Sequence, residues 1–384
     1  MANEHRDSHD ISMHQYVRRR DEGMVESNHL LQEAISRRIP HVLRERELSG
    51  VDRCNKIFSS IWLDANRVLA GTKDNQLMIW DHLSPLHTPL TRARFSCFCL
   101  PSYMTDDLGI NNCGIHSIAM SDDRVIATGG QKPEDIMIIQ GSNLRPSKLL
   151  RGHTDWVFAL EWIDTELLVS CSRDKSVMLW RPNQPGKKPV DVRLYHLDKV
   201  RDLKSARMTS LFATLSIDGT VKFWDVMSNP PLSTVHLRHT QDLVCMAFHQ
   251  KQGLFLVGSE SHVQILDPRT AKLVETVEAL ETGRGVRSLS VLEDVLTVGS
   301  GAGSLSFLDL RIMKYMELEN AGGRNFYRTG RGWLKRDSIF DNYFLGQEAP
   351  NAVYTHCYDP TRTKLFVGGG PLAFGLSGSY AAIW

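Results

Sequence analysis

An arginine interrupts an otherwise apolar stretch of this sequence, GVRSLSV at residues 285–291. The alternation predicts a buried strand in which Arg287 lies on the same face as Leu289 and Val291. A guanidinium can hold a carboxylate through two parallel hydrogen bonds, so an arginine in such a position suits the recognition of an anion. The simpler alternative is a strand end, at which the arginine side chain reaches solvent.

Two other sets of residues have the types needed for chemistry. His153 and Asp174, with a serine from the strand-like segment between them, match the residue types of a hydrolase triad. No G-x-S-x-G turn accompanies them, which argues against that chemistry. Cys97 and Cys99 form a close pair but lack nearby histidine or cysteine partners for a zinc site. We therefore expect a non-catalytic protein with no metal and no other cofactor.

The overall charge gives no sign of a polyanionic partner. The 384 residues contain 45 Lys+Arg and 44 Asp+Glu, for a formal net charge of +1. We therefore expect no direct nucleic-acid binding and no membrane binding, and any electrostatic function has to be local. The chain also lacks an apolar run long enough for a membrane span and a signal-peptide core. The expected location is cytoplasmic and nuclear, with YVRRR at residues 16–20 as a weak import signal.

Internal repetition is the strongest pattern in the sequence. Three segments, KDNQLMIWD, RDKSVMLW and IDGTVKFWD, each place an aspartate six residues before a tryptophan. The equivalent strand ends Leu266 and Leu308 lie 42 residues apart, which is close to the spacing of the tryptophans. Each repeat contains four short strand-like segments, the content of one β-propeller blade.

The repeats predict an all-β fold, a seven-bladed β-propeller, over residues 46–384. The chain ends on the third strand of the last blade, so the missing outer strand is assigned to residues 46–54, which closes the ring and removes an exposed sheet edge. The segments 82–112 and 312–350 are unusually long connections. The expected first strands of the blades begin at Ile57, Ile115, Val157, Val200, Leu243, Val286 and Val353.

Residues 1–45 precede the propeller and have a helical pattern at their end. Leu30, Leu31, Ala34 and Ile35 form one apolar face after Asn28, a plausible helix cap. Pro40 interrupts the pattern before a second short turn, so we expect a helix-loop-helix over residues 28–43. The alternative is an arm whose apolar stripe packs on its own propeller.

The propeller geometry gives Arg287 a set of companions. The residue after each first-strand start points into one mouth of the central channel, and Arg201 occupies this position as well. Lys73 and Arg173 each precede a turn aspartate, and Lys199 lies two positions before Arg201. All three are expected on the same side of the propeller. These cations repel one another unless an anion occupies the mouth or each is paired with an acid, as Arg173 with Asp174 or Arg201 with Asp202. The expected site consists of Lys73, Arg173, Lys199, Arg201 and Arg287, with His116 and Tyr354 as further polar contacts.

The repeats resemble the WD-repeat family, most clearly at Gly152-His153 and at Asp174 to Trp180. The resemblance implies a structural hydrogen-bonded set of His153, a strand serine (Ser170 or Ser172), Asp174 and Trp180. Further segments, including HTDWVFALEW, GSESHVQILDPR, TGRGWL and the last 35 residues, resemble the WD-repeat substrate receptors of cullin-4 ubiquitin ligases, in the family of the twelfth numbered factor associated with cullin-4 and its DNA-damage-binding adaptor.

That resemblance implies a receptor that docks on the adaptor and presents proteins with acidic C-terminal ends, especially Glu-Glu, for ubiquitination. The helical segment before residue 45 would then dock on the adaptor. The turns LDPR and LDLR are similar to the W-D-x-R signature of adaptor-binding receptors, with leucine in place of tryptophan. A general WD-repeat scaffold and a nucleic-acid binder are the alternatives. The implied adaptor contacts are Leu30, Leu31, Ala34, Ile35, Arg269 and Arg311.

Overall fold

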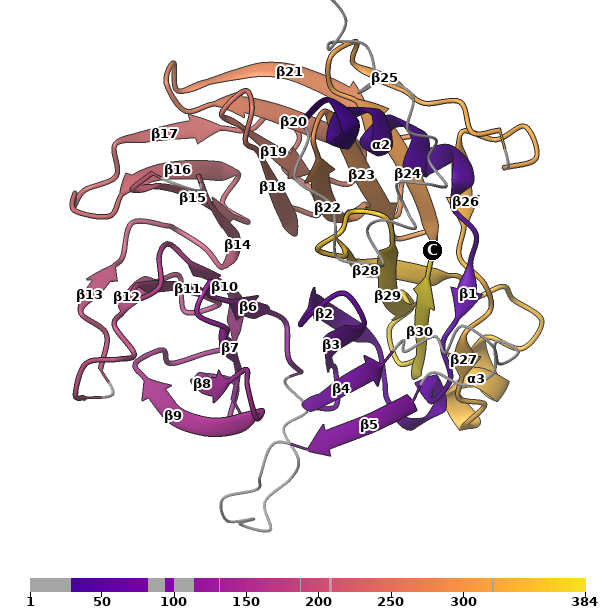
Figure 1. Cartoon of the computed structure of the whole chain (residues 1–384), viewed down its shortest axis with the longest axis horizontal. Coiled ribbons are helices and arrows are strands. Elements are labelled where there is room, and N and C mark those ends of the chain that lie inside the picture. Colours follow the sequence, from indigo (N-terminus) through magenta and orange to yellow (C-terminus); the bar gives the residue numbers. More distant parts are fainter. Residues whose placement is uncertain are drawn as a thin grey trace, which may run out of the picture.

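Seven antiparallel sheets surround a central axis in the computed structural model of the protein (Figure 1). The structure describes residues 29–81, 94–99, 114–130, 132–186, 188–206, 209–319 and 321–384. It confirms the predicted seven-bladed propeller. The 82–112 connection lies mostly outside the described residues. In each blade the first strand lies innermost, and we call the face at which these first strands begin the top face.

The first four blades each contain four strands. Blade 1 is β2 (Ile57–Trp62), β3 (Arg67–Thr72), β4 (Gln76–Asp81) and β5 (Arg94–Cys99). Blade 2 is β6 (Ile118–Met120), β7 (Val125–Gly129), β8 (Asp135–Gln140) and β9 (Arg145–Arg151). Blade 3 is β10 (Val157–Trp162), β11 (Leu168–Ser172), β12 (Val177–Trp180) and β13 (Asp191–Arg193). Blade 4 is β14 (Val200–Ser205), β15 (Leu211–Ser216), β16 (Thr220–Asp225) and β17 (Ser233–His236).

The last three blades complete the ring and include the additional pieces of the second long connection. Blade 5 is β18 (Cys245–His249), β19 (Leu254–Gly258), β20 (His262–Asp267) and β21 (Lys272–Glu278). Blade 6 is β22 (Val286–Leu292), β23 (Val295–Ser300) and β24 (Ser304–Asp309), and its outer edge is divided between β25 (Lys314–Tyr315) and β26 (Phe326–Arg328). Blade 7 is β28 (Asn351–Tyr358), β29 (Leu365–Pro371) and β30 (Gly378–Ile383), with β27 (Trp333–Leu334) and α3 (Ser338–Tyr343) nearby.

The N-terminal segment supplies the outer strand of blade 7. β1 (Arg46–Glu47) pairs antiparallel with β30, with Arg46 opposite Ile383. The Leu48 N–H extends the pairing by donating to the Ala381 carbonyl at 2.9 Å. The strand is shorter than the predicted 46–54, because Val51–Arg53 turn into a 3₁₀ helix. A strand near residue 46 and the last strand of the chain therefore pair in one sheet.

A single helix, α2 (His29–Val42), takes the place of the predicted helix-loop-helix. Pro40 lies inside its last turn, where the missing N–H leaves only one helical hydrogen bond unmade. The helix continues past the proline because Ile35, Ile39 and Leu43 form one buried seam against blades 6 and 7. The Pro40 carbonyl accepts a hydrogen bond from the Tyr327 hydroxyl at 2.7 Å. Neither helix in the described part of the chain is long and apolar enough to span a membrane.

A β-bulge occurs near the start of five inner strands. In β22 the pairing moves from Val286 opposite Ser300 to Ser288 opposite Gly299, so Arg287 is an extra residue with no partner across the ladder. The predicted shared face of Arg287, Leu289 and Val291 is therefore wrong, because the bulge interrupts the alternation between them. The extra residues in the five bulges are Phe58, Phe158, Arg201, Arg287 and Tyr354.

The hydrogen-bonded set implied by the WD-repeat resemblance is present in blade 3. His153 Nδ1 lies 2.9 Å from Asp174, and His153 Nε2 lies 2.7 Å from the Ser170 hydroxyl. The Trp180 indole N–H donates to the same hydroxyl at 2.8 Å. Burial alone would raise the pKa of Asp174, but its hydrogen bonds, led by the one with His153, outweigh that effect and lower the pKa. These residues are therefore structural, and Ser170 rather than Ser172 completes the set.

Blade 4 contains a second set that the sequence analysis did not identify. It uses His196, Thr214, Asp218 and Trp224, with Trp224 donating to the Thr214 hydroxyl at 2.8 Å. The sequence before His196 lacks the glycine that marks His153, but the aspartate-to-tryptophan spacing is the same. Both sets tie the loop before a blade to that blade's central turn.

We predict that Ser170→Ala destabilises the protein. The substitution leaves His153 Nε2 and the Trp180 indole N–H buried without this partner, which costs about 1–3 kcal/mol in the free energy of unfolding. Urea unfolding followed by tryptophan fluorescence measures the change. Ser147→Ala, at an exposed strand serine with one backbone partner, is the control. Equal stability of the two variants would contradict the structural role of Ser170.

Candidate functional site

The bulged residues meet at the top of the channel, where the first strands of all seven blades face one another (Figure 1). Phe58 stacks on His116 with ring centroids 4.8 Å apart and contacts Tyr354 edge-on at 5.3 Å. His116 also contacts Phe158 edge-on at 5.2 Å. Aromatic side chains therefore form one side of this ring, which we call the mouth. The ring positions are Phe58, His116, Phe158, Arg201, Val244, Arg287 and Tyr354.

Arg201 is a partly buried cation of the mouth. Its guanidinium carbon lies 4.1 Å from the centroid of the Phe158 ring. Its Nε is buried and has no hydrogen-bond partner. Burial lowers the pKa of Arg201, and the nearby charge of Arg287 lowers it further, although Cys171 and Asp202 oppose this shift. The Nε of Arg201 has therefore lost its contact with water, and no hydrogen bond within the protein replaces it.

The alternative pairing of Arg201 with Asp202 is not the arrangement observed. The Asp202 carboxylate instead accepts hydrogen bonds from two backbone N–H groups, those of Leu203 at 2.8 Å and Met246 at 2.6 Å. Met246 belongs to the next blade, so Asp202 fastens blade 4 to blade 5. The carboxylate of Asp202 therefore binds backbone N–H groups instead of Arg201.

Arg287 has a different environment, because an acid from the neighbouring blade reaches it. Its Nη2 lies 2.9 Å from Asp242 Oδ2, and its Nε donates to the Arg284 carbonyl at 3.1 Å. The Asp242 side chain is 47% exposed whereas that of Arg287 is 15% exposed. Part of the charge of Arg287 is thus neutralised by an acid that remains open to solvent.

The other three predicted cations lie around the same mouth in repeated positions. In each of three blades, the N–H before the turn aspartate donates to the carbonyl two residues before the mouth position. These bonds run from Lys73 to Lys56 at 2.9 Å, from Arg173 to Trp156 at 2.8 Å and from Ile217 to Lys199 at 3.0 Å. The structure therefore brings all five predicted cations to the top face.

Arg173 is partly compensated, but not by the acid that was considered in the sequence analysis. Its Nε lies 3.6 Å from Asp155 Oδ2, and its guanidinium lies 5.6 Å from the Trp156 ring centroid. Asp174, the acid beside it in sequence, is engaged by His153 and the Thr154 N–H.

Two charged residues of the mouth were missed. Lys56 and Asp242 lie two positions before Phe58 and Val244, the same offset at which Lys199 precedes Arg201. Burial, with a smaller effect from the charge of Lys73, lowers the pKa of Lys56 to about 8. Applying the offset of Lys199 to every blade would have identified both residues.

The two polar contacts in the prediction also belong to the mouth. His116 is the stacked partner of Phe58, as described above. Burial raises the pKa of Tyr354 to about 12, although the nearby Arg287 lowers it, and the Tyr354 hydroxyl donates to the Pro371 carbonyl at 3.4 Å. The mouth thus combines cations with a hydroxyl and aromatic surface, a combination suited to a carboxylate-rich ligand.

The opposite face contains the two arginines of the LDPR and LDLR turns. Asp267 Oδ1 accepts from both the backbone N–H and the Nε of Arg269 at 3.0 Å, and Asp309 and Arg311 repeat this arrangement at 2.9 and 3.3 Å. The Arg269 side chain is 73% exposed and that of Arg311 is 41% exposed. The acid before each arginine therefore holds it in a fixed orientation at the surface.

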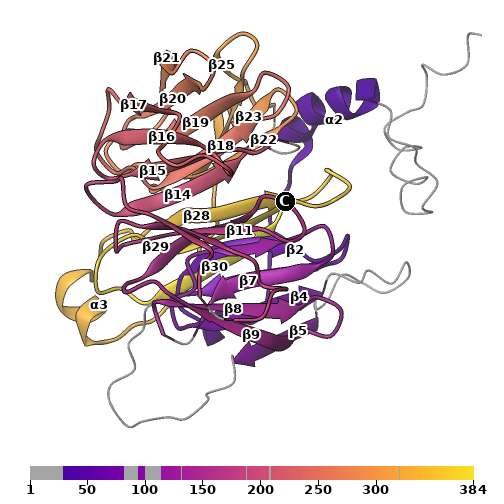
Figure 2. The same ribbon diagram turned by 90° about the vertical axis from the view of Figure 1, so that its left-hand side faces the viewer.

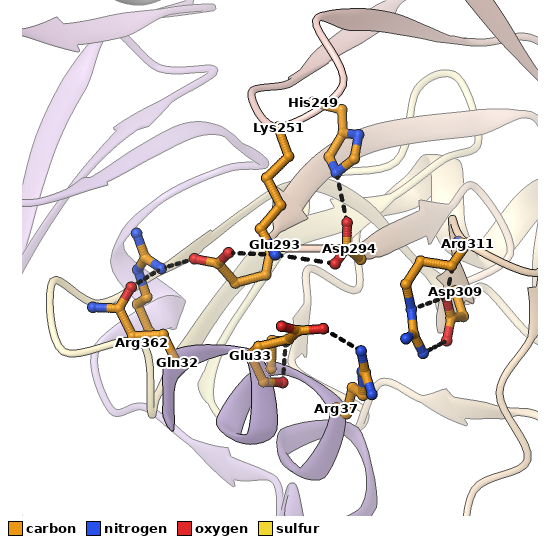
Figure 3. A network of polar contacts seen from close by, with 11 residues as sticks. Gln32, Glu33, Arg37, His249, Lys251, Glu293, Asp294, Asp309, Arg311 and Arg362 are labelled. Atoms are coloured by element: carbon orange, nitrogen blue, oxygen red, sulfur yellow. Dashed lines mark hydrogen bonds and ion pairs between the residues drawn. The ribbon is translucent and has the colours of Figure 1, made fainter. Parts of the chain in front are cut away.

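Helix α2 lies beside Arg311 and is held by a network of polar contacts (Figure 3). Arg362 donates to Gln32 at 2.8 Å and also pairs with Glu293. Lys251 lies 3.1 Å from both Glu293 and Asp294, the residues of the β22–β23 hairpin. The network connects the helix to the lower hairpins of blades 6 and 7 and to the end of β18.

This packing changes the prediction for the helical adaptor contacts. Ile35 is only 2% exposed and is part of the propeller core. This burial agrees with the alternative given above, in which the apolar face of the N-terminal segment packs on its own propeller. Ala34 is exposed. Leu30 and Leu31 lie in α2, but their side chains are outside the described part. The outer side of α2 remains available for a partner, whereas its Ile35 side does not.

The fold and the repeated histidine–aspartate–tryptophan sets define a WD-repeat β-propeller. The chain belongs to the family described as "DDB1- and CUL4-associated factor 12 beta propeller", which matches residues 39–192 and 181–384.

Two curated relatives match part of the chain, and one solved structure shares its fold. The chain is 28% identical over 137 residues to a ribosome biogenesis protein WDR12 homolog of Culex quinquefasciatus, covering 35% of this chain and 32% of that protein. It is 25% identical over 220 residues to a guanine nucleotide-binding protein subunit beta of Saccharomyces cerevisiae, covering 54% and 47%. The matches thus span about a third to a half of these relatives. The WD40 β-propeller domain of Doa1 superposes with a TM-score of 0.63 at 15% identity, covering 88% of this chain and 95% of that one, which supports the fold alone.

We predict that Arg201→Met stabilises the free protein. Methionine removes a buried Nε without a partner and the repulsion from Arg287 while keeping apolar contact with Phe158. The free energy of unfolding should rise by about 1 kcal/mol, measured by urea unfolding. Lys272→Met, at an exposed position on β21, should leave it unchanged. A clear loss of stability in Arg201→Met would show that the other contacts of Arg201 outweigh its unpartnered Nε, and would contradict the prediction.

Proposed function

We propose that this protein is the substrate-recognition subunit of a cullin-4 RING ubiquitin ligase. Its mouth binds the acidic C-terminal ends of proteins, of the Glu-Glu type, and its opposite face docks on the DNA-damage-binding adaptor. The subunit is non-catalytic and presents the bound protein for ubiquitination. Membership in a family whose description includes DDB1 and CUL4 supports the ligase part of the proposal.

The observation that supports the substrate part is the buried Nε of Arg201, which has no hydrogen-bond partner. Desolvating a cation costs free energy. The positive charge of Arg287, two ring positions away, also repels that of Arg201. A bound carboxylate would relieve both effects, and an arginine can grip it with two hydrogen bonds. A chain that ends in Glu-Glu supplies three carboxylates to a mouth with cations from blades 1, 3, 4 and 6.

The ring shape favours a chain end over an internal segment. An internal acidic pair has to enter and leave through the same mouth, so both flanking segments compete for space. A free C-terminus enters once and brings the additional terminal carboxylate. Position within the partner should therefore matter as much as charge.

A non-catalytic WD-repeat scaffold for another complex is the alternative function. The relatives named above include proteins with other roles, and a propeller fold is compatible with many partners. The scaffold alternative requires no preference for a free acidic C-terminus, which distinguishes it from the receptor.

We predict that a peptide ending in Glu-Glu binds the full chain and that Arg201→Ala weakens binding about tenfold or more. The reason is the loss of a charge-assisted hydrogen bond, which contributes about 1.5–3 kcal/mol. Arg287→Ala should weaken binding less than Arg201→Ala, because Asp242 already neutralises part of its charge. Fluorescence anisotropy of a labelled peptide measures both affinities.

The controls separate charge from position. The same peptide with an amidated end, or extended by one glycine, should bind more weakly than the free Glu-Glu end. Arg238→Ala removes an exposed arginine from the top of blade 5 and should leave the affinity unchanged. Equal binding of the three peptides would refute recognition of the terminal carboxylate.

We predict that Arg269→Glu reduces co-purification of the adaptor about fivefold. Arg269 is the more exposed of the two turn arginines, and its reversal leaves the contacts of α2 intact. Quantitative immunoprecipitation from cells gives the measurement. Arg145→Glu, at an exposed arginine on the same face of blade 2, is the matched control. Unchanged co-purification in Arg269→Glu would remove Arg269 from the docking surface.

A further inference from the structure

The mouth contains a carboxylate of its own. Asp242 lies in the turn before β18, two positions before Val244. Lysine occupies this offset in blades 1 and 4, so blade 5 supplies an acid where those blades supply a cation. Over the seven blades, the residues at this offset are Lys56, Gly114, Trp156, Lys199, Asp242, Gly285 and Ala352. Blade 5 therefore places a negative charge at a position that is neutral or positive in the other blades.

Asp242 contacts the atom of Arg287 that a bound carboxylate would need. Its Oδ2 lies 2.9 Å from Arg287 Nη2. A guanidinium can grip a carboxylate along two edges, Nε with Nη2 or Nη1 with Nη2, and both edges include Nη2. Nε already donates to the carbonyl of Arg284. A ligand carboxylate that takes a two-bond grip on Arg287 therefore meets Asp242 at the same nitrogen.

The surrounding backbone leaves room for this pair. A Cβ at Gly285 would lie 3.2 Å from Arg287 Nη2 and 3.3 Å from Asp242 Oδ2. Asp242 has a φ of 55°, in the left-handed region that aspartate and asparagine adopt more readily than most residues. Beside it, the carbonyl of Gln241 accepts a hydrogen bond from the Glu260 N–H at 2.9 Å. The backbone of blades 5 and 6 therefore fixes where the aspartate meets the arginine.

The exposure of the two side chains indicates which one moves when a ligand binds. The side chain of Asp242 is 47% exposed, whereas that of Arg287 is 15% exposed and is also held through its Nε. The aspartate can therefore turn outward and be hydrated, while the arginine stays in the mouth. An ion pair in such contact with water contributes little to the stability of the fold, so separating it has a small energetic cost.

The charge of Asp242 acts on Arg201 as well. Burial lowers the pKa of Arg201, the charge of Arg287 lowers it further, and Asp242 is among the acids that oppose this shift. Asp242 thus lies close enough to both arginines to offset part of their repulsion in the free protein. A ligand that brings its own carboxylates takes over this role, and its charge is then repelled by Asp242.

We propose that Asp242 is an internal competitor of the ligand, which pairs with Arg287 in the free protein and gives way to a carboxylate of the partner's acidic end. The inference rests on the proposed function and identifies a residue that limits affinity at that site. The affinity of the mouth then depends on the exchange of one carboxylate for another at Arg287, not on the filling of an empty position. When the ligand leaves, Asp242 pairs with Arg287 again.

The experiment is a double-mutant cycle on the full chain. Asp242→Asn removes the charge, keeps an acceptor oxygen for Arg287 and suits the left-handed backbone. It is combined with Arg287→Ala. A labelled peptide ending in Glu-Glu is titrated by anisotropy into wild type, the two single variants and the double variant. Glu260→Gln removes the same charge from the top turn between β19 and β20 of the same blade and is the matched control.

We expect Asp242→Asn to bind the peptide about fivefold more tightly than wild type, and Arg287→Ala to cancel most of this gain in the double variant. Glu260→Gln should leave the affinity close to that of wild type. Such a result requires that Asp242 acts through Arg287 and not through the general charge of the top face.

Four results would overturn the proposal. Weaker binding by Asp242→Asn would show that the aspartate positions Arg287 for the ligand. Unchanged binding would show that the two carboxylates do not compete. A gain that survives Arg287→Ala, or an equal gain in Glu260→Gln, would assign the effect to general charge. In all four cases wild type still binds the peptide and the proposed function stands, whereas a failure of wild type and every variant to bind would overturn both.

Discussion

The bulge at the start of the inner strands is the constraint on which the mouth depends. A regular strand alternates its side chains between the two neighbouring blades, and both sides are filled by the core. One extra residue in the first strand has no place in either core, and the bulge turns it toward the axis. Five blades repeat this device, so their extra side chains meet in one small ring. The identity of that residue can then vary without disturbing blade packing.

This separation explains how the protein accommodates two arginines side by side in the mouth. Arg201 and Arg287 lie outside the hydrophobic clusters between blades, so their electrostatic cost does not interrupt the buried strands. Part of the cost is offset locally, by the Phe158 face for Arg201 and by Asp242 for Arg287. The remaining cost is what a bound anion would relieve. A binding site that is under-compensated in the free protein is a common result of selection for function over stability.

The periodic features were predictable from sequence because they depend on local spacing. The interval from Asp174 to Trp180 locates a turn and a strand whatever surrounds them, and its repetition fixes the number of blades. The channel position of Arg201 follows from the same count. Lys56 could have been predicted by the same count, because it lies two positions before Phe58 as Lys199 lies two positions before Arg201.

Features that depend on distant parts of the chain were not predictable in this way. The bulge at Arg287 is a matter of hydrogen-bond register between two strands, and the residue types alone do not reveal it. Asp242 reaches Arg287 from 45 residues away, and Arg362 reaches Gln32 from 330 residues away. Helix α2 continues through Pro40 because the propeller supplies the packing that an isolated helix would lack.

The same strands that present the mouth also carry the contacts of α2, which links the two faces mechanically. β22 has Arg287 as its second residue, at the mouth, and leads into the hairpin of Glu293 and Asp294, which binds Lys251 and Arg362. β28 likewise has Tyr354 near its start, and its hairpin carries Arg362 (Figure 2 shows α2 and α3 on opposite sides). Seven residues of β22 span about 20 Å. A ligand held by the mouth and a partner held beside α2 would therefore be kept at a fixed separation by paired strands. Such a rigid spacer suits a receptor that has to hold one protein at a defined place relative to another.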